Sequence, residues 1–255
     1  MIYDLQKASM WKRISAWLFD TILLLVLITG FATVVSMVTG YDGQVKKMEG
    51  YEKKYAEEYN INPDITYEEY EKLSDEKKQA YADADEAFRN DPDCIKTSNI
   101  VYNLTLIITA LGILLAVLIW EFIIPLFLKN GQTFGKKIFG IAVMRTNGVK
   151  VSNVQLFIRA ILGKYTFEIM LPVFSIILLL FGQAGIFSIG MIALILIVQI
   201  AFLIGTRKTT RSAIHDLLSD TVTVDLASQL IFNNEEELIK YKEEQHAKMV
   251  TRSPY

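Results

Sequence analysis

Three ionisable residues of this sequence lie within or beside long apolar stretches, where a charged side chain is unexpected. Asp20 and Glu121 each interrupt a long apolar stretch, and Arg13 precedes Asp20 by seven residues. A carboxylate at the centre of a membrane helix costs about 2.5–3.5 kcal/mol on insertion scales, so chance is a poor explanation for either acid. A carboxylate in that setting can bind a proton or a cation, which makes both acids candidates for ion chemistry.

Arg13 and Asp20 are expected to share one face of a helix, with Ala16 between them, because seven residues nearly complete two turns. Two interpretations remain open for this face. The two charges form a structural pair that anchors helix packing, or Asp20 titrates and binds cations. In either case the small Ala16 side chain lets another helix approach.

A layer of polar groups is expected at one depth of the membrane. Asp20, Glu121 and Gln199 each fall in the cytoplasmic third of a predicted span. Asn103 lies eighteen residues before Glu121 and would extend the layer into a polar stripe along one helix face. This layer is a hypothesis about depth alone.

A second group of ionisable residues follows the last apolar stretch, in "TRKTTRSAIHDLLSD". Arg211 and His215 are four residues apart, and Asp216 comes next, so the three cluster within two helical turns. His215 and Asp216 are candidates for proton binding because histidine titrates near pH 6.5, and Arg211 is their charge partner. The alternative is a packing element beside the membrane.

The elements that position these residues are apolar blocks. Hydrophobic residues make up 52% of the 255 residues and charged residues 21%, and the two are segregated. A span of about 20 apolar residues crosses a membrane as a helix. The predicted spans are residues 14–38, 100–128, 165–181 and 186–204. The fold class is therefore an all-α integral membrane protein with about four transmembrane helices and an extracytoplasmic helical insert between the first two.

The distribution of charge sets the topology. Residues 41–98 carry nine Lys or Arg against sixteen Asp or Glu, whereas residues 129–155 carry basic residues without acids. By the positive-inside rule the acidic insert lies outside and both termini are cytoplasmic, in a multi-pass protein of a bacterial cell membrane. The predicted segments are 1–40 (cytoplasmic N-terminus and first span), 41–98 (acidic insert), 99–128 (second span), 129–164 (basic turn and interfacial helix), 165–205 (third and fourth spans) and 206–255 (juxtamembrane element and charged tail).

The acidic insert is predicted to be helical, with a break at Asn62-Pro63. Thr66 fits a capping box with Glu69, and Ser74 can cap the next helix. The insert either extends two membrane helices as a simple hairpin or presents a docking surface to a protein partner. Its acids lack the spacing of a calcium loop.

The turn "NGQTFGKKIFG" superficially resembles a phosphate loop, but its glycines are four apart and Lys137 stands where Ser or Thr is required. We expect Lys136 and Lys137 to lie on lipid headgroups instead. Asn147-Gly148 predicts a short hairpin, and residues 154–164 predict a helix along the membrane interface.

Other classes of chemistry find little support. Cys94 is the single cysteine and there are two histidines, which excludes an intramolecular disulfide and argues against a metal site. No HExxH motif or other enzyme motif is present. We expect no enzymatic activity, no cofactor and no nucleic-acid partner.

Three short segments together resemble the RDD family of bacterial membrane proteins. Arg13 with Asp20 resembles the first family element, "GQTFGKK" its glycine turn, and "RSAIHDLLSDTVTV" its last element, which makes Asp216 the second aspartate. The resemblance does not cover residues 41–98. It implies a multi-pass architecture and two candidate activities, sodium/proton exchange and a regulatory membrane role.

Two functions therefore remain. A transporter that exchanges Na⁺ or K⁺ for protons would use the intramembrane carboxylates, and with so few spans it would act as a homo-oligomer. A non-enzymatic regulator or scaffold would use the outer insert or the charged tail to bind a protein partner.

Overall fold

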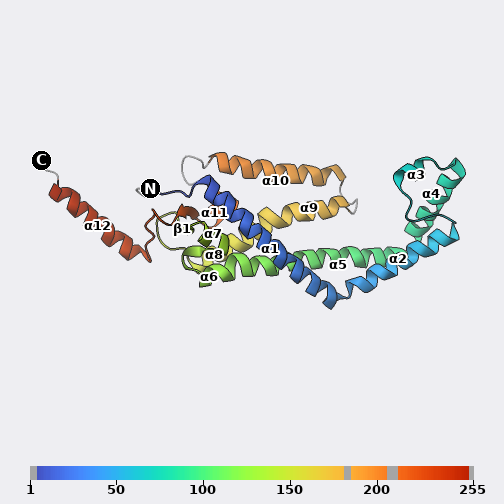
Figure 1. The fold of residues 1–255 in the computed structure, drawn as a ribbon, viewed down its shortest axis with the longest axis horizontal. Helices are drawn as coiled ribbons and strands as arrows, with labels where there is room; N and C mark the ends of the chain where they lie inside the picture. Colours follow the sequence, from blue (N-terminus) through green and yellow to red (C-terminus); the bar gives the residue numbers. More distant parts are fainter. Residues whose placement is uncertain (1–4, 181–184, 206–211, 253–255) are drawn as a thin grey trace. The chain divides into compact units, whose positions relative to one another are not determined.

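The computed structural model describes residues 5–180, 185–205 and 212–252, and these are mostly helical (Figure 1). The chain divides into two compact units, which are considered separately. One unit comprises Met1–Phe31 with Gly112–Tyr255, and the other comprises Ala32–Leu111. The candidate site residues that the sequence singles out belong to the first unit, with the exception of Asn103.

Three helical runs are long and apolar enough to cross a membrane: Met10–Thr39, Pro92–Phe127 and Asn153–Leu180. The first is helix α1 (Met10–Thr39). A fourth apolar helix, α10 (Gly185–Gly205), follows, and its described apolar stretch Ile189–Val198 is shorter. The described residues thus give three candidate spans, and a fourth stays a prediction.

The second and third runs share an unusual construction, a π-helix that ends two residues before a proline. The second run consists of α5 (Pro92–Val117), the π-helix η1 (Leu118–Ile123) and α6 (Ile124–Phe127). The third consists of α8 (Asn153–Ile158), the π-helix η3 (Arg159–Met170) and α9 (Leu171–Leu180).

Pro125 and Pro172 supply the physical reason for these π-helices. Proline lacks a backbone N–H and its ring clashes with the carbonyl four residues earlier, so a wider turn before it relieves the conflict. The residues four positions before the two prolines are Glu121 and Glu168. Both glutamates therefore stand where the helix is widened.

The third run begins earlier than the sequence predicts. Ser152 caps α8 through a capping box with Gln155, and the helix continues without a break to Leu180. The interfacial helix predicted for residues 154–164 therefore lies in the first half of a candidate span, and its place along the membrane interface stays a prediction. Arg159 and Lys164, which interrupt the apolar stretch, are both paired inside the protein.

The prediction of an all-α fold needs a correction, because a small antiparallel sheet joins β1 (Ile141–Arg145) to β2 (Thr221–Asp225). Instead of the hairpin predicted around Asn147-Gly148, the chain forms a tight turn with a single antiparallel β-bridge between Met144 and Lys150. The partner of β1 lies some eighty residues away because both strands bury their alternating apolar side chains in one core.

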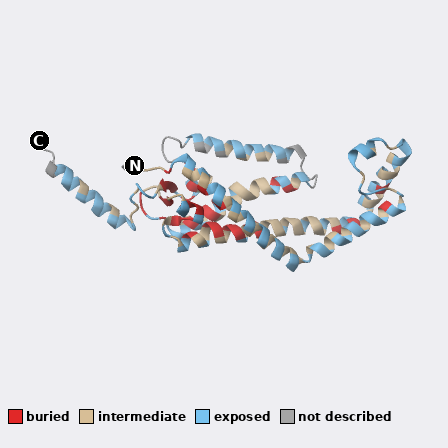
Figure 2. Cartoon of the chain, in the orientation of Figure 1, coloured by how far each residue is buried: buried red, intermediate tan, exposed pale blue. Residues whose placement is uncertain are grey.

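Short elements close the first unit around this sheet. They are the 3-10 turn η2 (Lys129–Gly131), α7 (Phe134–Ile138) and α11 (Ile214–Leu218). Figure 2 shows the buried residues gathered around β1, α6, α7 and α8. A charged helix, α12 (Glu235–Arg252), follows.

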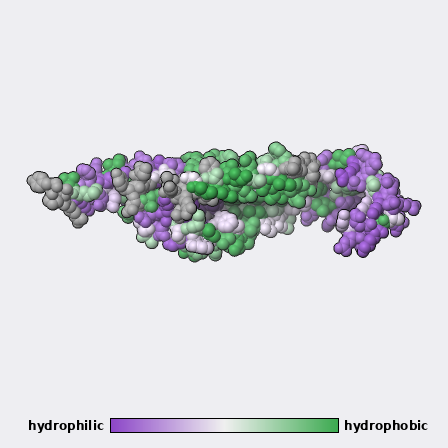
Figure 3. All heavy atoms as spheres, turned by 90° about the horizontal axis from the view of Figure 1, so that it is seen from above, coloured by the Kyte–Doolittle hydropathy of each residue, from purple (hydrophilic) through white to green (hydrophobic). Residues whose placement is uncertain are grey.

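The second unit contains α2 (Tyr41–Glu58), α3 (Tyr67–Glu71) and α4 (Asp75–Asn90). The capping box at Thr66 and the cap at Ser74 are confirmed. Tyr55 packs edge-on against Phe88, which ties α2 to α4. Figure 3 shows a hydrophilic surface over these helices and an apolar surface over α10.

Candidate functional site

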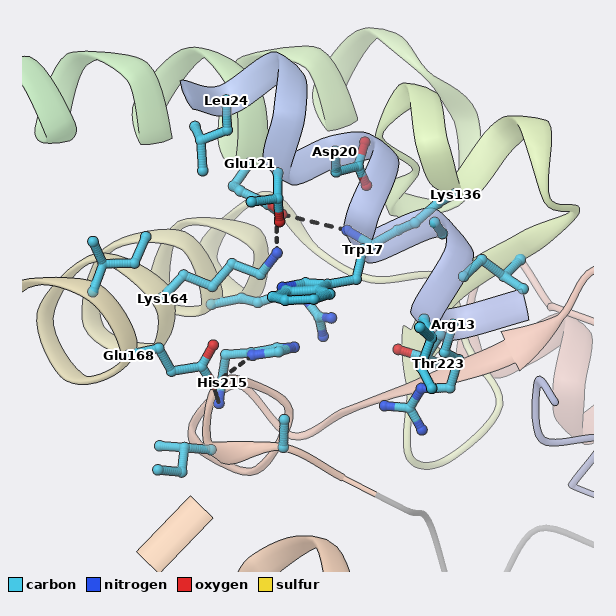
Figure 4. Close-up of a pocket in the computed structure, with 18 of the residues that line it drawn as sticks. Arg13, Trp17, Asp20, Leu24, Glu121, Lys136, Lys164, Glu168, His215 and Thr223 are labelled. Atoms are coloured by element: carbon cyan, nitrogen blue, oxygen red, sulfur yellow. Dashed lines mark hydrogen bonds and ion pairs between the residues drawn. The ribbon is translucent and has the colours of Figure 1, made fainter. Parts of the chain in front are cut away.

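A cavity of about 530 Å³ lies inside the first unit, between α1, the two π-helices and α11 (Figure 4). Its polar lining includes Asp20, Glu121, Lys164 and His215, and its apolar lining comes largely from α1. A cavity of this size with a few converging polar groups has the usual character of a ligand site.

Asp20 binds three neutral donors from two other elements. Its Oδ1 accepts from Trp120 Nε1 at 3.2 Å and from the backbone N–H of Gly135 at 2.9 Å. Its Oδ2 accepts from Thr133 Oγ1 at 2.5 Å. Asp20 is buried and forms no ion pair with any described residue. Its direct contacts are therefore hydrogen bonds from neutral donors, and its charge also acts on Lys136.

The glycine turn is what lets α7 reach Asp20. A Cβ on Gly135 would stand 2.5 Å from the carbonyl oxygen of Ala16 and 2.8 Å from the Asp20 carboxylate. Only glycine permits this approach. Thr133 also caps α7 by accepting from the N–H of Lys136, so the whole turn folds inward onto α1.

Glu121 lies between two lysines. Lys136 Nζ is 3.3 Å from its Oε2, and Lys164 Nζ donates to its Oε1. Burial lowers the pKa of Lys136 to about 8, and the charge of Glu121 opposes that shift. The prediction that Lys136 contacts lipid headgroups is wrong, because its side chain is 9% exposed and neutralises a buried acid. Lys137 is exposed, and its headgroup contact stays a prediction.

Asp216 is fully buried and is bound by two arginines. Arg159 Nη1 donates to its Oδ1, and Arg13 Nη2 lies 3.5 Å from its Oδ2. Arg159 also donates to Thr221 Oγ1 at 2.8 Å. Although burial acts in the opposite direction, the arginine charges hold the pKa of Asp216 below its usual range. The ion pair considered for Arg13 and Asp20 is thus wrong: the arginine reaches across the fold to Asp216 instead.

His215 turns toward η3. Its Nδ1 lies 2.7 Å from Glu168 Oε1, and its backbone N–H donates to the same oxygen at 3.2 Å. Burial lowers the pKa of His215, the nearby Arg159 charge lowers it further, and the charges of Glu168 and Asp216 oppose both effects. The histidine is thus favoured in its neutral form with Nδ1–H as a donor.

The fold brings together the sequence candidates Asp20, Glu121, His215 and Asp216, together with Arg13. This group does not include every residue of the predicted polar layer. Asn103 is exposed and belongs to the other unit, and its stripe with Glu121 stays a prediction. Arg211 and the side chain of Gln199 lie outside the described residues.

Sequence reasoning missed five participants, and several left a signal. Arg159, Lys164 and Glu168 recur at four- to five-residue intervals in an apolar segment, the spacing of one helix face. The shared pattern Glu-x-x-x-Pro at Glu121 and Glu168 was a further signal. Trp120 and Thr133 gave no signal, because only the tertiary contact with Asp20 sets them apart.

The charges of the site balance. Four acids (Asp20, Glu121, Glu168 and Asp216) accompany four bases (Arg13, Lys136, Arg159 and Lys164), and His215 is favoured neutral. Among the described residues no group of three or more His, Cys, Asp or Glu could hold a metal ion. The arrangement is suited to holding protons and charged groups at fixed positions.

The long apolar helices and the compensated charges buried among them define the class: a helical membrane protein with a polar cavity. A family model described as the RDD family matches residues 7–220, and the chain therefore belongs to the RDD family. A search of curated proteins and a search of solved structures each found no match.

Proposed function

We propose that this RDD family protein exchanges Na⁺ or K⁺ for protons across a bacterial cell membrane, with Asp20 as the group that alternately binds the two. The observation that carries the proposal is the setting of Asp20. It is a buried carboxylate in a candidate span, it lines the cavity, and all its direct partners are neutral.

The other carboxylates differ from Asp20 in this respect. Glu121 and Asp216 are each bound by two cationic side chains. Protonation of either acid would leave buried bases without a counter-charge, which is costly. Protonation of Asp20 strands no base. Glu121, Asp216 and His215 then act as fixed charges and proton-sensitive neighbours around a single carrier.

Binding at Asp20 is coupled to helix contacts. The carboxylate joins α1 to η1 through Trp120 and to α7 through Gly135 and Thr133. Hydrogen bonds to an ionised carboxylate are stronger than hydrogen bonds to the neutral acid. Loss of the negative charge would therefore loosen α1 from its neighbours, the kind of change that alternating access requires.

Purified protein in proteoliposomes provides the test. Proton movement driven by a sodium or potassium gradient is expected in the wild type and is expected to be lost in Asp20→Asn. Asp225→Asn replaces a carboxylate that does not line the cavity and is the control that should keep this flux, and thermal stability in detergent is measured for all three. Absence of flux in the wild type under every gradient would overturn the proposal.

The orientation and assembly of the protein belong to the same proposal. We place both termini in the cytoplasm and the acidic insert outside, on the basis of the charge asymmetry. We place the protein in the membrane as a homo-oligomer, because few spans are available in one chain to enclose a pathway.

A membrane regulator or scaffold is the second candidate function. The separate compactness of Ala32–Leu111 and the exposed charged helix α12 favour it, since neither part contributes to the cavity. Replacement of residues 41–91 by a short linker distinguishes the two functions. Ion exchange should survive this change in a transporter, whereas a scaffold acting through the insert should lose its cross-links to a partner.

A further inference from the structure

The polar end of the cavity holds donors that the protein itself leaves unused. Arg159 donates only through Nη1, to Asp216 and Thr221. Within residues 5–180, 185–205 and 212–252, its Nε and Nη2 have no hydrogen-bond acceptor. Neither of these two atoms is completely buried. Lys164 donates to Glu121 alone, and an ammonium group has three N–H donors. Both residues line the cavity, so two cationic groups there have donors to spare.

The net charge of the side chains that line the cavity is also positive. Four basic side chains (Arg13, Lys136, Arg159 and Lys164) face the cavity, against three acids (Asp20, Glu121 and Glu168). The fourth acid, Asp216, lies behind the lining and is fully buried. The surface that a ligand meets is therefore cationic by one charge while His215 is neutral.

The remaining wall of the cavity is apolar and comes from candidate spans. Leu24 and Ile28 of α1 face Ile169 of η3, and these three pack on one hydrophobic cluster. Trp17 and Leu25 also line the cavity and stay exposed, at 61% and 56%, so the cavity is open to its surroundings. In a membrane those surroundings are lipid. Figure 4 shows Lys164 and His215 on one side of Trp17, with Leu24 farther along α1.

We propose that this cavity binds an anionic membrane lipid, which lies with its phosphate at Arg159 and Lys164 and with one acyl chain along Leu24 and Ile28. Guanidinium and ammonium groups are the usual partners of phosphate. The volume of about 530 Å³ is within the range of small-ligand pockets and accepts one chain with a phosphate. Asp20 lines the same cavity, but the residues proposed to contact the lipid are different from the partners of Asp20, which lie on η1 and α7.

Two substitutions test the contacts of the phosphate and the contacts of the acyl chain separately. Lys164→Gln removes one phosphate donor, while Lys136 still neutralises Glu121. Leu24→Trp fills the apolar wall and leaves every charge in place. The matched controls are Lys150→Gln, an exposed lysine that does not line the cavity, and Val26→Trp, an exposed position on the same helix that does not line the cavity either.

Native mass spectrometry of the full chain in phosphatidylcholine nanodiscs measures the binding. Wild-type protein is expected to retain one phosphatidylglycerol molecule in preference to phosphatidylcholine. Lys164→Gln and Leu24→Trp should each weaken this binding by about tenfold, the loss typical of one charge-assisted hydrogen bond or one blocked chain. Both control variants should bind as the wild type does.

Three results would overturn the proposal. Equal retention of phosphatidylcholine would show that the charge of the lipid plays no part. Inorganic phosphate that displaces the lipid at millimolar concentration would show a site for free phosphate. Unchanged binding in a folded Leu24→Trp protein would place the lipid elsewhere. None of these readouts depends on ion flux, so the lipid site and the exchange activity succeed or fail separately.

Discussion

Gly163 and His215 are in such close contact that a Cβ on Gly163 would stand 2.4 Å from the Cβ of His215. This contact presses α11 onto η3. It sets His215 against Glu168 and brings Asp216 to Arg159, so the absence of one side chain positions a hydrogen bond and an ion pair.

Gly163→Ala is therefore expected to destabilise the protein by about 1–3 kcal/mol through overpacking. Gly190→Ala is the matched control, because nothing lies within 4 Å of a Cβ at that helical position. It should be neutral or slightly stabilising, since alanine favours helix more than glycine does. Thermal unfolding in detergent measures both. Equal melting temperatures for the two variants would contradict the close contact.

Acid pH should weaken the protein through His215. Its pKa in the folded protein is lowered by burial and by Arg159, against the opposing charge of Glu168. As the pH falls, His215 is therefore protonated near pH 6.5 in the unfolded chain and only at lower pH in the folded chain. The free energy of unfolding falls as the pH drops below about 6.5. His215→Gln should flatten this part of the profile of melting temperature against pH. A profile identical to that of the wild type would refute the assignment.

Asp216→Asn should be among the most damaging single substitutions. It removes the counter-charge of the buried Arg159, which typically costs about 3–5 kcal/mol. Asp225→Asn breaks a pair with the more exposed Lys12 and should cost about 1 kcal/mol or less. Because its pKa is depressed, Asp216 contributes stability above the unfolded value and loses it as the pH falls toward the folded value. Comparable melting temperatures for the two variants would argue against the buried arginine network.

Lys136 and Lys137 are adjacent and should behave differently. Lys136→Ala removes a buried partner of Glu121 and should lower the melting temperature. Lys137→Ala should leave stability unchanged and weaken attachment to anionic vesicles, if the exposed lysine meets headgroups. Measurement of both properties for both variants checks the assignment. A Lys136→Ala protein as stable as the wild type would show that Lys164 alone satisfies Glu121.

Topology requires a probe outside the core, because the native Cys94 is buried. Tyr67 is 77% exposed, so Tyr67→Cys in a Cys94→Ala background offers an accessible thiol. An impermeant maleimide should label it in intact cells if residues 41–98 are outside. Labelling confined to lysed cells, with the thiol reactive after lysis, would reverse the orientation.

Local features of the sequence determined the helical elements. Apolar length predicted the first two spans, and polar caps predicted the start of α3 at Thr66 and of α4 at Ser74, because both signals act within a few residues. The family motifs likewise pointed to the residues of one site. Asp20, Glu121 and Asp216 were identifiable because a carboxylate beside an apolar span is costly unless it has a purpose.

Only the tertiary structure decided which charges meet. Arg13 is seven residues from Asp20 yet binds Asp216, 203 residues away, and β1 pairs with β2 instead of with its neighbour in sequence. Helical periodicity fixes the face on which a side chain lies and says nothing about which distant element packs there. That choice rests on the close approaches at Gly135 and Gly163, and on the need to give every buried charge a partner.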